Sequence, residues 1–150
     1  MSARRPVRRT RSAGGIVWRP ATQAHALVDI VVCYRDATSV TCLPKGTPET
    51  GEKIEETAVR EVQEETGLVV EPEHYLGSTS YWFATSAERI HKTVSWWLFR
   101  AVGGNVANHD AEFDRVEWMP ANEAVARLTY SDERELVERA LERIAGELAV

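Results

Sequence analysis

The feature that most constrains this chain is a glutamate-rich segment whose spacing predicts an amphipathic helix. At about 100° per residue, with Ala58 as the reference, Ile54 lies at about −40° and Val62 at about +40°. These positions define an apolar stripe. Glu65 falls at about −20° and Glu61 at about −60°, on or beside the stripe rather than opposite it. Carboxylates placed there lose hydration and need a cation or hydrogen bonds that compensate for it.

Three of these acids, Glu61, Glu64 and Glu65, are spaced so that they lie within about 5–6 Å of one another on a helix and repel each other. A divalent cation would remove the repulsion, and oxygen ligands suit magnesium or manganese. The alternative is an ordinary amphipathic helix whose acids are solvated and whose Arg60 is a surface residue. The spacing by itself leaves both interpretations open.

Composition limits the classes of protein to which the chain can belong. A length of 150 residues suits one domain, and 43% hydrophobic with 27% charged residues is usual for a globular protein. No apolar run approaches the roughly 20 residues needed to cross a membrane. The apolar stretch after the basic start, Ala13 to Trp18, is short for a signal peptide, so we do not expect export, and a mitochondrial presequence is the alternative. Cys33 and Cys42 form no C-x-x-C pair. We therefore expect both to be reduced thiols that act as small core residues, and we expect a cytoplasmic protein.

The N-terminus is basic although the chain has a net charge of −5. We expect residues 1–11 to form a flexible, solvated arm and residues 12–150 to form the domain. An acidic body repels nucleic acid, which argues against a nucleic-acid partner, although contact through the arm is an alternative. The arm carries five arginines, Arg4, Arg5, Arg8, Arg9 and Arg11.

Strand and helix patterns alternate irregularly along the chain, which predicts an α/β fold with a mixed sheet between helices. Gly67 is placed to end the glutamate-rich helix in the left-handed conformation, and either Asp132 or Glu135 could cap the last helix. The apolar stripe of that last helix is Leu136, Ala140, Ile144 and Leu148. The expected strands are Ser12–Trp18, Leu27–Tyr34, Thr41–Leu43, His74–Phe83, Thr93–Ala101 and Arg115–Met119, and the expected helices begin near Glu52, at Pro120 and near Asp132.

The segment GTPETGEKIEETAVREVQEETGL, residues 46–68, resembles the Nudix box at every fixed position. It has a glycine, a glutamate six residues later, the run Arg-Glu-Val-Gln-Glu-Glu at 60–65, and Gly67-Leu68. The resemblance implies a Nudix-type α/β/α sandwich. It also implies a hydrolase that uses Mg²⁺ or Mn²⁺ to cleave a diphosphate linkage in a nucleoside diphosphate-X compound. Members are often dimers, so the resemblance allows a homodimer.

The resemblance also assigns roles to residues of this chain. Glu61, Glu64 and Glu65 would be the metal ligands, and Glu52 and Arg60 would orient them. The backbone carbonyl of Lys45 would complete the coordination. A carboxylate of the cluster would accept the proton of the attacking water, with Glu64 the first choice and Glu61 the second. Many relatives add an acid from a later loop, for which Glu112 is the candidate and Asp110 and Asp114 are the alternatives.

Other residues are candidates for holding the substrate. Lys45, Lys92 and His91 could contact phosphate, although each could equally be a solvated surface residue. Tyr81 and Tyr130 are the candidates for stacking on a nucleobase. The sequences around Lys45, around Lys92 and at residues 117–119 resemble the diadenosine polyphosphate hydrolase branch. We therefore expect dinucleoside polyphosphates such as diadenosine tetraphosphate as substrate.

Three alternatives remain. The first is a pyrophosphohydrolase of nucleoside triphosphates, including oxidised ones, because that branch shares part of the pattern. The second is a non-catalytic nucleotide-binding module, which the complete set of box carboxylates argues against. The third is an isomerase of the same fold, which would need an acid or thiol pair in a deep apolar pocket, and neither cysteine is obviously placed for that.

Overall fold

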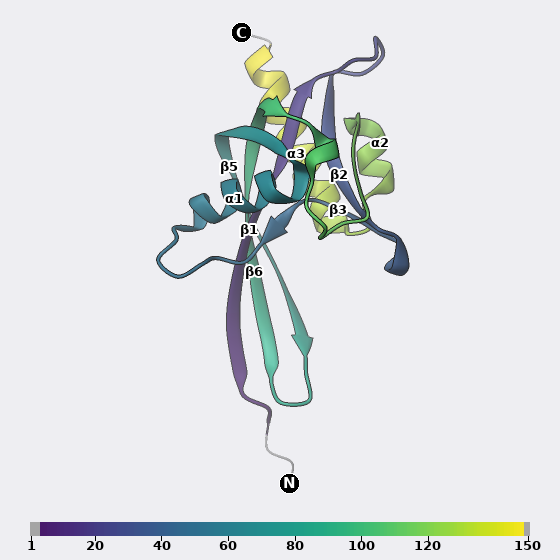
Figure 1. The fold of residues 1–150 in the computed structure, drawn as a ribbon. Coiled ribbons are helices and arrows are strands. Elements are labelled where there is room, and N and C mark those ends of the chain that lie inside the picture. Colours follow the sequence, from purple (N-terminus) through teal and green to yellow (C-terminus); the bar gives the residue numbers. More distant parts are fainter. Residues whose placement is uncertain (1–3, 149–150) are drawn as a thin grey trace.

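The computed structural model describes residues 4–148, which are built around a seven-stranded sheet (Figure 1). The strands are β1 (Val7–Pro20), β2 (Val28–Arg35), β3 (Val40–Cys42), β4 (Lys45–Gly46), β5 (Leu68–Ala84), β6 (Arg89–Gly104) and β7 (Arg115–Pro120). The helices are α1 (Ile54–Thr66), α2 (Ala121–Arg127) and α3 (Ser131–Leu148), with short 3₁₀ turns at Asp36–Thr38 and Val106–Asn108.

The sheet is mixed, as the irregular alternation of elements predicts. Its order is β3-β2-β1-β6-β5, with β4 paired to β1 and β7 paired to β2. The β1–β6 pair is parallel and every other pair is antiparallel. The long parallel ladder joins segments about eighty residues apart in the chain, and it places β1 in the middle of the sheet.

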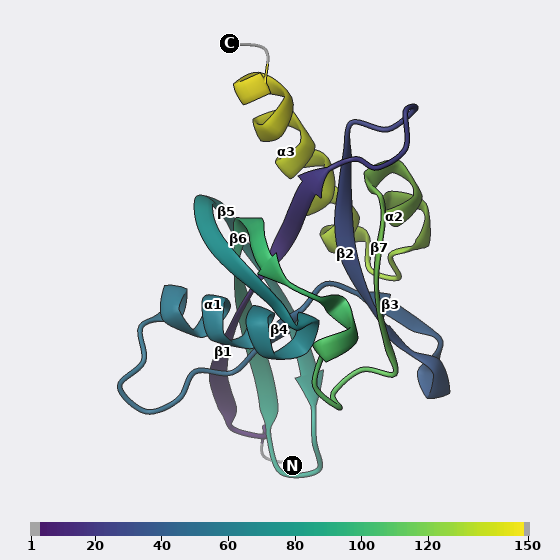
Figure 2. The ribbon, with the colours of Figure 1, turned by 45° about the horizontal axis from the view of Figure 1, so that its top comes forward.

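Helices cover both faces of the sheet, which makes the α/β/α sandwich that the sequence predicts (Figures 1 and 2). On one face α1 packs against the sheet through Ala58 and Val62, which contact a cluster that includes Val17, Val31 and Phe99. On the other face α2 and α3 pack over a second cluster. Its largest fully buried side chains include Ile16, Ile30, Leu98, Leu128, Leu136 and Ile144.

The boundaries of α1 follow from local chemistry. The helix begins at Ile54, two residues later than expected, and the carboxylate of Glu56 accepts a hydrogen bond from the backbone N–H of Lys53 at 3.0 Å. It ends as predicted at Gly67, whose φ of 75° is left-handed. A side chain at this position would also lie 2.4 Å from the carbonyl of Asn105, so glycine is required twice over.

The prediction for the N-terminal arm needs correction, because β1 begins at Val7 and not at Ser12. Residues 7–11, assigned to a solvated arm, instead pair with β6 from Arg89 to Thr93. This segment has no apolar alternation that marks a strand, so only the partner strand makes it extended. Residues 1–3 of the predicted arm lie outside the described residues.

Smaller differences concern the ends of elements. Leu27 precedes β2 and is 54% exposed, and Pro120 closes β7 as the residue before α2 rather than forming its first turn. Cys33 and Cys42 are buried free thiols opposite each other on β2 and β3, as expected of small core residues. Within residues 4–148, no helix is long and apolar enough to cross a membrane.

The apolar stripe of α3 is confirmed for Leu136, Ala140 and Ile144, whereas Leu148 is 58% exposed. Truncating Leu136 leaves a cavity between α3 and the sheet. We therefore expect Leu136→Ala to lower the free energy of unfolding by about 2–5 kcal/mol. Leu148→Ala, the same change on the same helix, should change it by no more than about 0.5 kcal/mol. Urea denaturation measures both values, and equal losses would contradict the packing described.

Candidate active site

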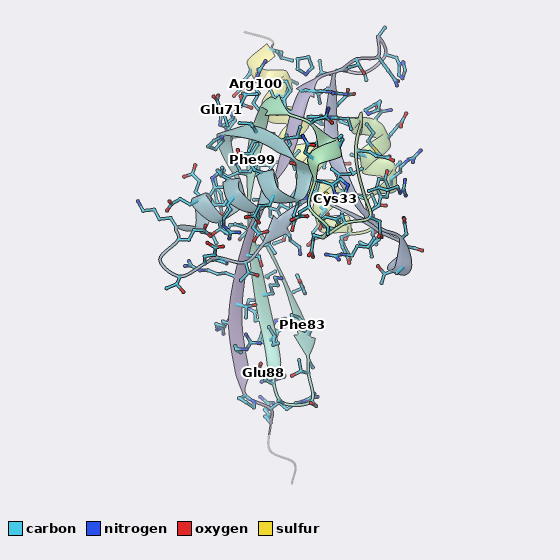
Figure 3. All side chains as sticks on the ribbon, in the orientation of Figure 1. Cys33, Glu71, Phe83, Glu88, Phe99 and Arg100 are labelled. Atoms are coloured by element: carbon cyan, nitrogen blue, oxygen red, sulfur yellow. The ribbon has the colours of Figure 1, made fainter. Side chains whose placement is uncertain are left out.

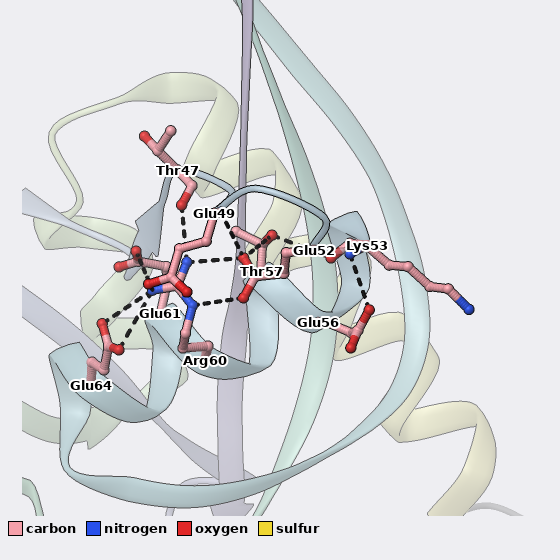
Figure 4. Close-up of polar contacts among 9 residues, drawn as sticks. All are labelled: Thr47, Glu49, Glu52, Lys53, Glu56, Thr57, Arg60, Glu61 and Glu64. Carbon is pink, nitrogen blue, oxygen red and sulfur yellow. Dashed lines mark hydrogen bonds and ion pairs between the residues drawn. The ribbon is translucent and has the colours of Figure 1, made fainter.

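The loop between β4 and α1 is tied to the helix by an ion pair between Arg60 and Glu52 (Figure 4). The guanidinium donates from Nε to Oε2 at 2.7 Å and from its second amino group to Oε1 at 2.9 Å. Thr57 also donates its hydroxyl to this carboxylate. The guanidinium of Arg60 is the largest cause that lowers the pKa of Glu52 to about 2, followed by the Thr57 hydroxyl. Glu52 therefore stays ionised and anchors Arg60.

Arg60 in turn reaches two of the predicted metal ligands (Figure 4). Its first amino group lies 2.9 Å from Glu61 Oε1 and 3.4 Å from Glu64 Oε2, while the other donates to the carbonyl of Thr47 at 3.0 Å. Glu64 is half exposed, whereas Glu61 is mostly buried. The structure thus brings Glu52, Arg60, Glu61 and Glu64 together.

Gly46 is placed directly against the carboxylate of Glu61. A Cβ at this position would lie 2.0 Å from Glu61 Cδ, far inside van der Waals contact. Burial is the main cause that raises the pKa of Glu61, while Arg60 acts in the opposite direction. The box glycine is therefore needed so that the strand β4 can approach the helix carboxylate.

Glu65 is the most buried acid of the cluster, with 4% of its surface exposed. Its Oε2 accepts a hydrogen bond from the backbone N–H of Lys45 at 3.0 Å. None of the ion pairs formed by residues 4–148 includes Glu65. Burial, followed by the charges of Glu61 and Asp110, raises its pKa to about 8. A carboxyl group held in this way gains most from a cation.

Glu61 and Glu65 line a cleft of about 700 Å³ between the box and the end of β2. Glu112, the predicted additional acid, lines the same cleft and forms an ion pair with Arg35. Asp110 lies close enough for its charge to raise the pKa of Glu65, so it remains an alternative. Asp114 instead accepts a hydrogen bond from the backbone of Asp36, which takes it away from the carboxylates.

The carboxylates fit a hard divalent cation by their chemistry but are not closed around one. In the described part of the chain, no group of three or more His, Cys, Asp or Glu side chains is arranged to hold a metal. Two of the predicted ligands, Glu61 and Glu64, instead form ion pairs with Arg60 (Figure 4). Glu61, Glu65 and Glu112 remain oxygen donors on one cleft, a set that suits Mg²⁺ or Mn²⁺.

Two lysines face this cleft. Lys45 and Lys92 both line it, and the pKa of Lys92 is lowered first by burial and then by the charge of Lys45. His91, the third predicted phosphate contact, is not part of this group. It neighbours Lys92 on β6, so it points to the opposite face of the sheet, where it stacks on Trp82.

A smaller pocket of about 320 Å³ adjoins the cleft, and Lys45 and Tyr130 line both. Both predicted stacking residues, Tyr81 and Tyr130, are in its wall. The structure therefore brings together Lys45, Tyr81 and Tyr130, which the sequence analysis proposed as separate substrate contacts. The remaining lining residues are Thr79, Val94, Trp96, Asp132 and Glu133.

The sequence analysis missed Glu133 and Arg35. Glu133 is 4% exposed, and it accepts a hydrogen bond from the backbone N–H of Leu43 at 2.8 Å. Burial raises its pKa to about 7. An acid in the first turn of a helix is usually a solvated residue that stabilises the helix end, and the neighbouring sequence does not indicate that Glu133 is buried. Arg35 lies one residue beyond the expected strand, with no motif to mark it.

Comparison with known proteins identifies the family of the chain. The model of the family described as "NUDIX domain" matches residues 8–140. The chain belongs to the Nudix family, a class whose fold and box it carries in full.

Two curated relatives are similar in sequence. A Mycobacterium tuberculosis protein named "Putative mutator protein MutT4" is 48% identical over 102 residues, which are 68% of this chain and 41% of the relative. An "8-oxo-(d)GTP phosphatase" of Mycolicibacterium smegmatis is 32% identical over 139 residues, 89% of this chain and 42% of the relative. The chain thus matches about two fifths of the length of each.

Among solved structures, a Caenorhabditis elegans Ap4A hydrolase in a binary complex superimposes with a TM-score of 0.69. The alignment covers 91% of this chain and 98% of that one at 17% identity. At this identity the likeness supports the fold.

The close approach of Gly46 to Glu61 yields a test of the predicted metal site. Gly46→Ala would push the carboxylate of Glu61 out of the cleft. We expect Mn²⁺ affinity, measured by electron paramagnetic resonance, to fall by about tenfold or more. Gly146→Ala is the matched control, because no described atom lies within 4 Å of a Cβ added there. Unchanged Mn²⁺ affinity in Gly46→Ala would exclude Glu61 as a ligand.

The raised pKa of Glu65 predicts a pH dependence of stability in the metal-free protein. A carboxyl group whose pKa rises from 4.5 to about 8 on folding binds more protons when folded, so stability falls as pH increases between these values. Glu133 contributes in the same direction. Comparing wild type with Glu65→Gln isolates Glu65, and the variant should lose less stability between pH 5 and pH 8.

Mg²⁺ should change this result. The cation binds the ionised carboxylate, so its stabilising effect in thermal unfolding should be larger at pH 8 than at pH 5 in wild type. The difference should shrink in Glu65→Gln. If stability depended on pH identically in wild type and in Glu65→Gln, with and without Mg²⁺, the prediction that Glu65 is a buried carboxyl group that binds the cation would be wrong.

Proposed function

We propose that the chain is a metal-dependent pyrophosphohydrolase that cleaves a diphosphate linkage of a nucleoside triphosphate, with oxidised guanine nucleotides as the favoured substrate. The observation that carries the proposal is the continuity of the two hollows. Lys45 and Tyr130 line both the carboxylate cleft and the aromatic pocket. A nucleotide could therefore place its phosphates beside the acids and its base in the pocket.

The carboxylates support binding of Mg²⁺ or Mn²⁺. Glu61, Glu64 and Glu65 would hold it, together with the carbonyl of Lys45 and an acid of the loop before β7, Glu112 or Asp110. A bound cation neutralises phosphate charge and acidifies water. Release of Glu64 from Arg60 would be needed to complete the set, because Arg60 now lies 3.4 Å from it.

The side chains of the cleft would prepare the substrate for attack. Lys45, Lys92 and Arg35 line the cleft and can bind phosphate oxygens, which reduces the repulsion of the incoming water. Water attacks phosphorus, the bond to the leaving phosphate oxygen breaks, and the water proton passes to a carboxylate. Glu64 is the proposed acceptor and Glu61 the second choice, since Glu64 is half exposed and so within reach of water.

The smaller pocket supports a purine with several N–H donors. Tyr81, Tyr130 and Trp96 offer aromatic surface, while Asp132 and Glu133 offer carboxylate oxygens. Guanine presents N–H groups on its N1 and N2 edge, and oxidation at C8 adds an N7–H. A pocket with two acids can accept these bonds. The 8-oxo-(d)GTP phosphatase named among the relatives supports the same substrate class.

A second candidate substrate is a dinucleoside polyphosphate such as diadenosine tetraphosphate. The observation that favours it is the guanidinium plane of Arg35 in the larger cleft, which lies 4.6 Å over the ring of the buried Phe113 and offers a second surface for stacking. Two bases could thus find separate stacking positions with Lys45 and Lys92 available to the phosphates. The mononucleotide is preferred because one curated relative is named for that class, as an 8-oxo-(d)GTP phosphatase.

A product assay tests the function. The purified protein with Mg²⁺ is given 8-oxo-dGTP, dGTP, diadenosine tetraphosphate and ADP-ribose, and products are separated by chromatography. We expect the highest kcat/KM for 8-oxo-dGTP. Glu61→Gln, Glu64→Gln and Glu65→Gln should each lower kcat by about a hundredfold or more. Glu138→Gln, an exposed acid of α3, is the control and should retain activity.

The other outcomes redirect the proposal. A preference for diadenosine tetraphosphate would support the proposed reaction but replace the proposed substrate. Glu133→Gln should reduce the preference for 8-oxo-dGTP over dGTP while the hydrolysis of dGTP persists, if the pocket reads the base. If no compound is hydrolysed although nucleotides bind, the chain is a binding module and the catalytic proposal fails.

A further inference from the structure

The first half of β1 and the β5–β6 hairpin form a three-stranded extension that projects beyond the helical layers (Figure 1). We define the extension as residues 7–13, 78–84 and 89–95. Figure 3 shows Phe83 and Glu88 far from the packed body that holds Cys33 and Phe99. The end of the extension next to the body is buried at Ser12, Ala13 and Val94, whereas Arg9, Arg11 and Trp82 are exposed to solvent.

The register of the strands sorts the side chains onto two faces. Residues that pair across strands point to the same face. One face carries Arg9, His91 and Trp82 in a row, because β6 residue His91 pairs with both others. The next two rows toward the body are Arg11, Thr93 and Ser80, and then Ala13, Ser95 and Ser78. The row at the tip is Val7, Arg89 and Ala84. We call this surface the basic face.

The basic face has cations and no acids. Arg9 and Arg11 are exposed, and among the described residues no carboxylate lies within ion-pair distance of Arg9, Arg11 or Arg89. The acid of the hairpin, Glu88, pairs with Arg8 at 2.8 Å, and Arg8 points to the other face. Positive charge is therefore concentrated here although the whole chain carries −5.

An exposed aromatic ring lies among these cations. Trp82 is 54% exposed, and one side of its indole stacks on His91 with centroids 4.6 Å apart and planes at 29°. The guanidinium of Arg89 lies 5.8 Å from the indole centroid, and Arg9 contacts the His91 ring nitrogen at 3.1 Å. The histidine and the arginines hold the indole in place without covering it.

We propose that the basic face binds single-stranded RNA. Aromatic rings that stack on bases, beside arginines that follow the phosphates, are the chemistry by which proteins hold single strands. Arg9 and Arg11 are about 6.7 Å apart along β1, which matches successive phosphates of an extended strand. Trp82 lies two strands away, within reach of a base from the same nucleotides.

Hydroxyl groups favour RNA over DNA on this face. Ser78, Ser80 and Thr93 lie between the aromatic row and the body, with both serines exposed. A 2′-hydroxyl can donate to and accept from such side chains, and it distinguishes the two polymers. A duplex would present a rigid, stacked cylinder, whose bases could not reach Trp82.

The test uses fluorescence anisotropy with a labelled twelve-nucleotide oligouridine and the full chain. Arg9→Gln combined with Arg11→Gln should weaken binding and flatten the dependence of log affinity on log salt by about 1.4, or about 0.7 per lost phosphate contact. Trp82→Ala should weaken binding by about tenfold or more, and Trp82→Phe should restore most of the loss. Arg8→Gln removes one positive charge from the other face of β1 and should have little effect.

Several results would overturn the proposal. Failure of the wild type to bind oligouridine, or equal losses in Arg8→Gln and in the Arg9 and Arg11 variants, would remove the basic face as the site. Equal affinity for oligothymidine would remove the assignment to RNA. A dimer, seen by light scattering, that dissociates in Trp82→Ala would assign the face to a second copy of the chain.

The proposal is separable from the hydrolase activity. None of Arg9, Arg11 and Trp82 lines the cleft or the pocket. Their variants should therefore keep the kcat for nucleotide hydrolysis, whereas Glu61→Gln should lose hydrolysis and keep RNA binding. If the wild type hydrolyses no nucleotide, the proposed function is refuted, whereas the RNA-binding proposal still depends only on the anisotropy measurements.

Discussion

The structure depends on the docking of the box helix onto the backbone of β4. Glu65 is buried against the N–H of Lys45, and Glu61 fills the space over Gly46. Two carboxylates are thereby desolvated next to each other, an arrangement that costs folding free energy unless a cation joins them. Burial of these two carboxylates therefore lowers the stability of the fold, and a cation bound between them, as we propose, would add its binding free energy to that stability.

A second set of interactions, the ion pairs of Arg60, acts on the same carboxylates. Arg60, anchored by Glu52, contacts both Glu61 and Glu64 and partly satisfies the acids in the absence of a cation. The same contacts keep Glu64 out of the cleft. A divalent cation that binds here, as we propose, has to compete with the guanidinium of Arg60, which Glu52 holds by two hydrogen bonds.

The long β1–β6 ladder connects the two parts of the molecule that we assign to ligands. On the face that α3 covers, it positions Lys92 and Trp96 beside the cleft and the pocket. On the opposite face it orders Arg9 and Arg11 next to Trp82. Because side chains alternate along a strand, one ladder serves the nucleotide pocket with one face and presents the basic surface with the other.

By itself the sequence determined the box, its helix and the end of that helix at Gly67, because helical periodicity, capping and the Nudix pattern are local in the chain. It also indicated the apolar stripe of α3 and the mixed sheet. It misjudged residues 7–11, whose strand exists only through pairing with β6. It also overlooked Glu133, whose side chain is buried where the first turn of α3 meets the backbone of Leu43. Tertiary structure alone decided which candidates share a cavity and which, like His91, face away, since that depends on register between segments distant in the chain.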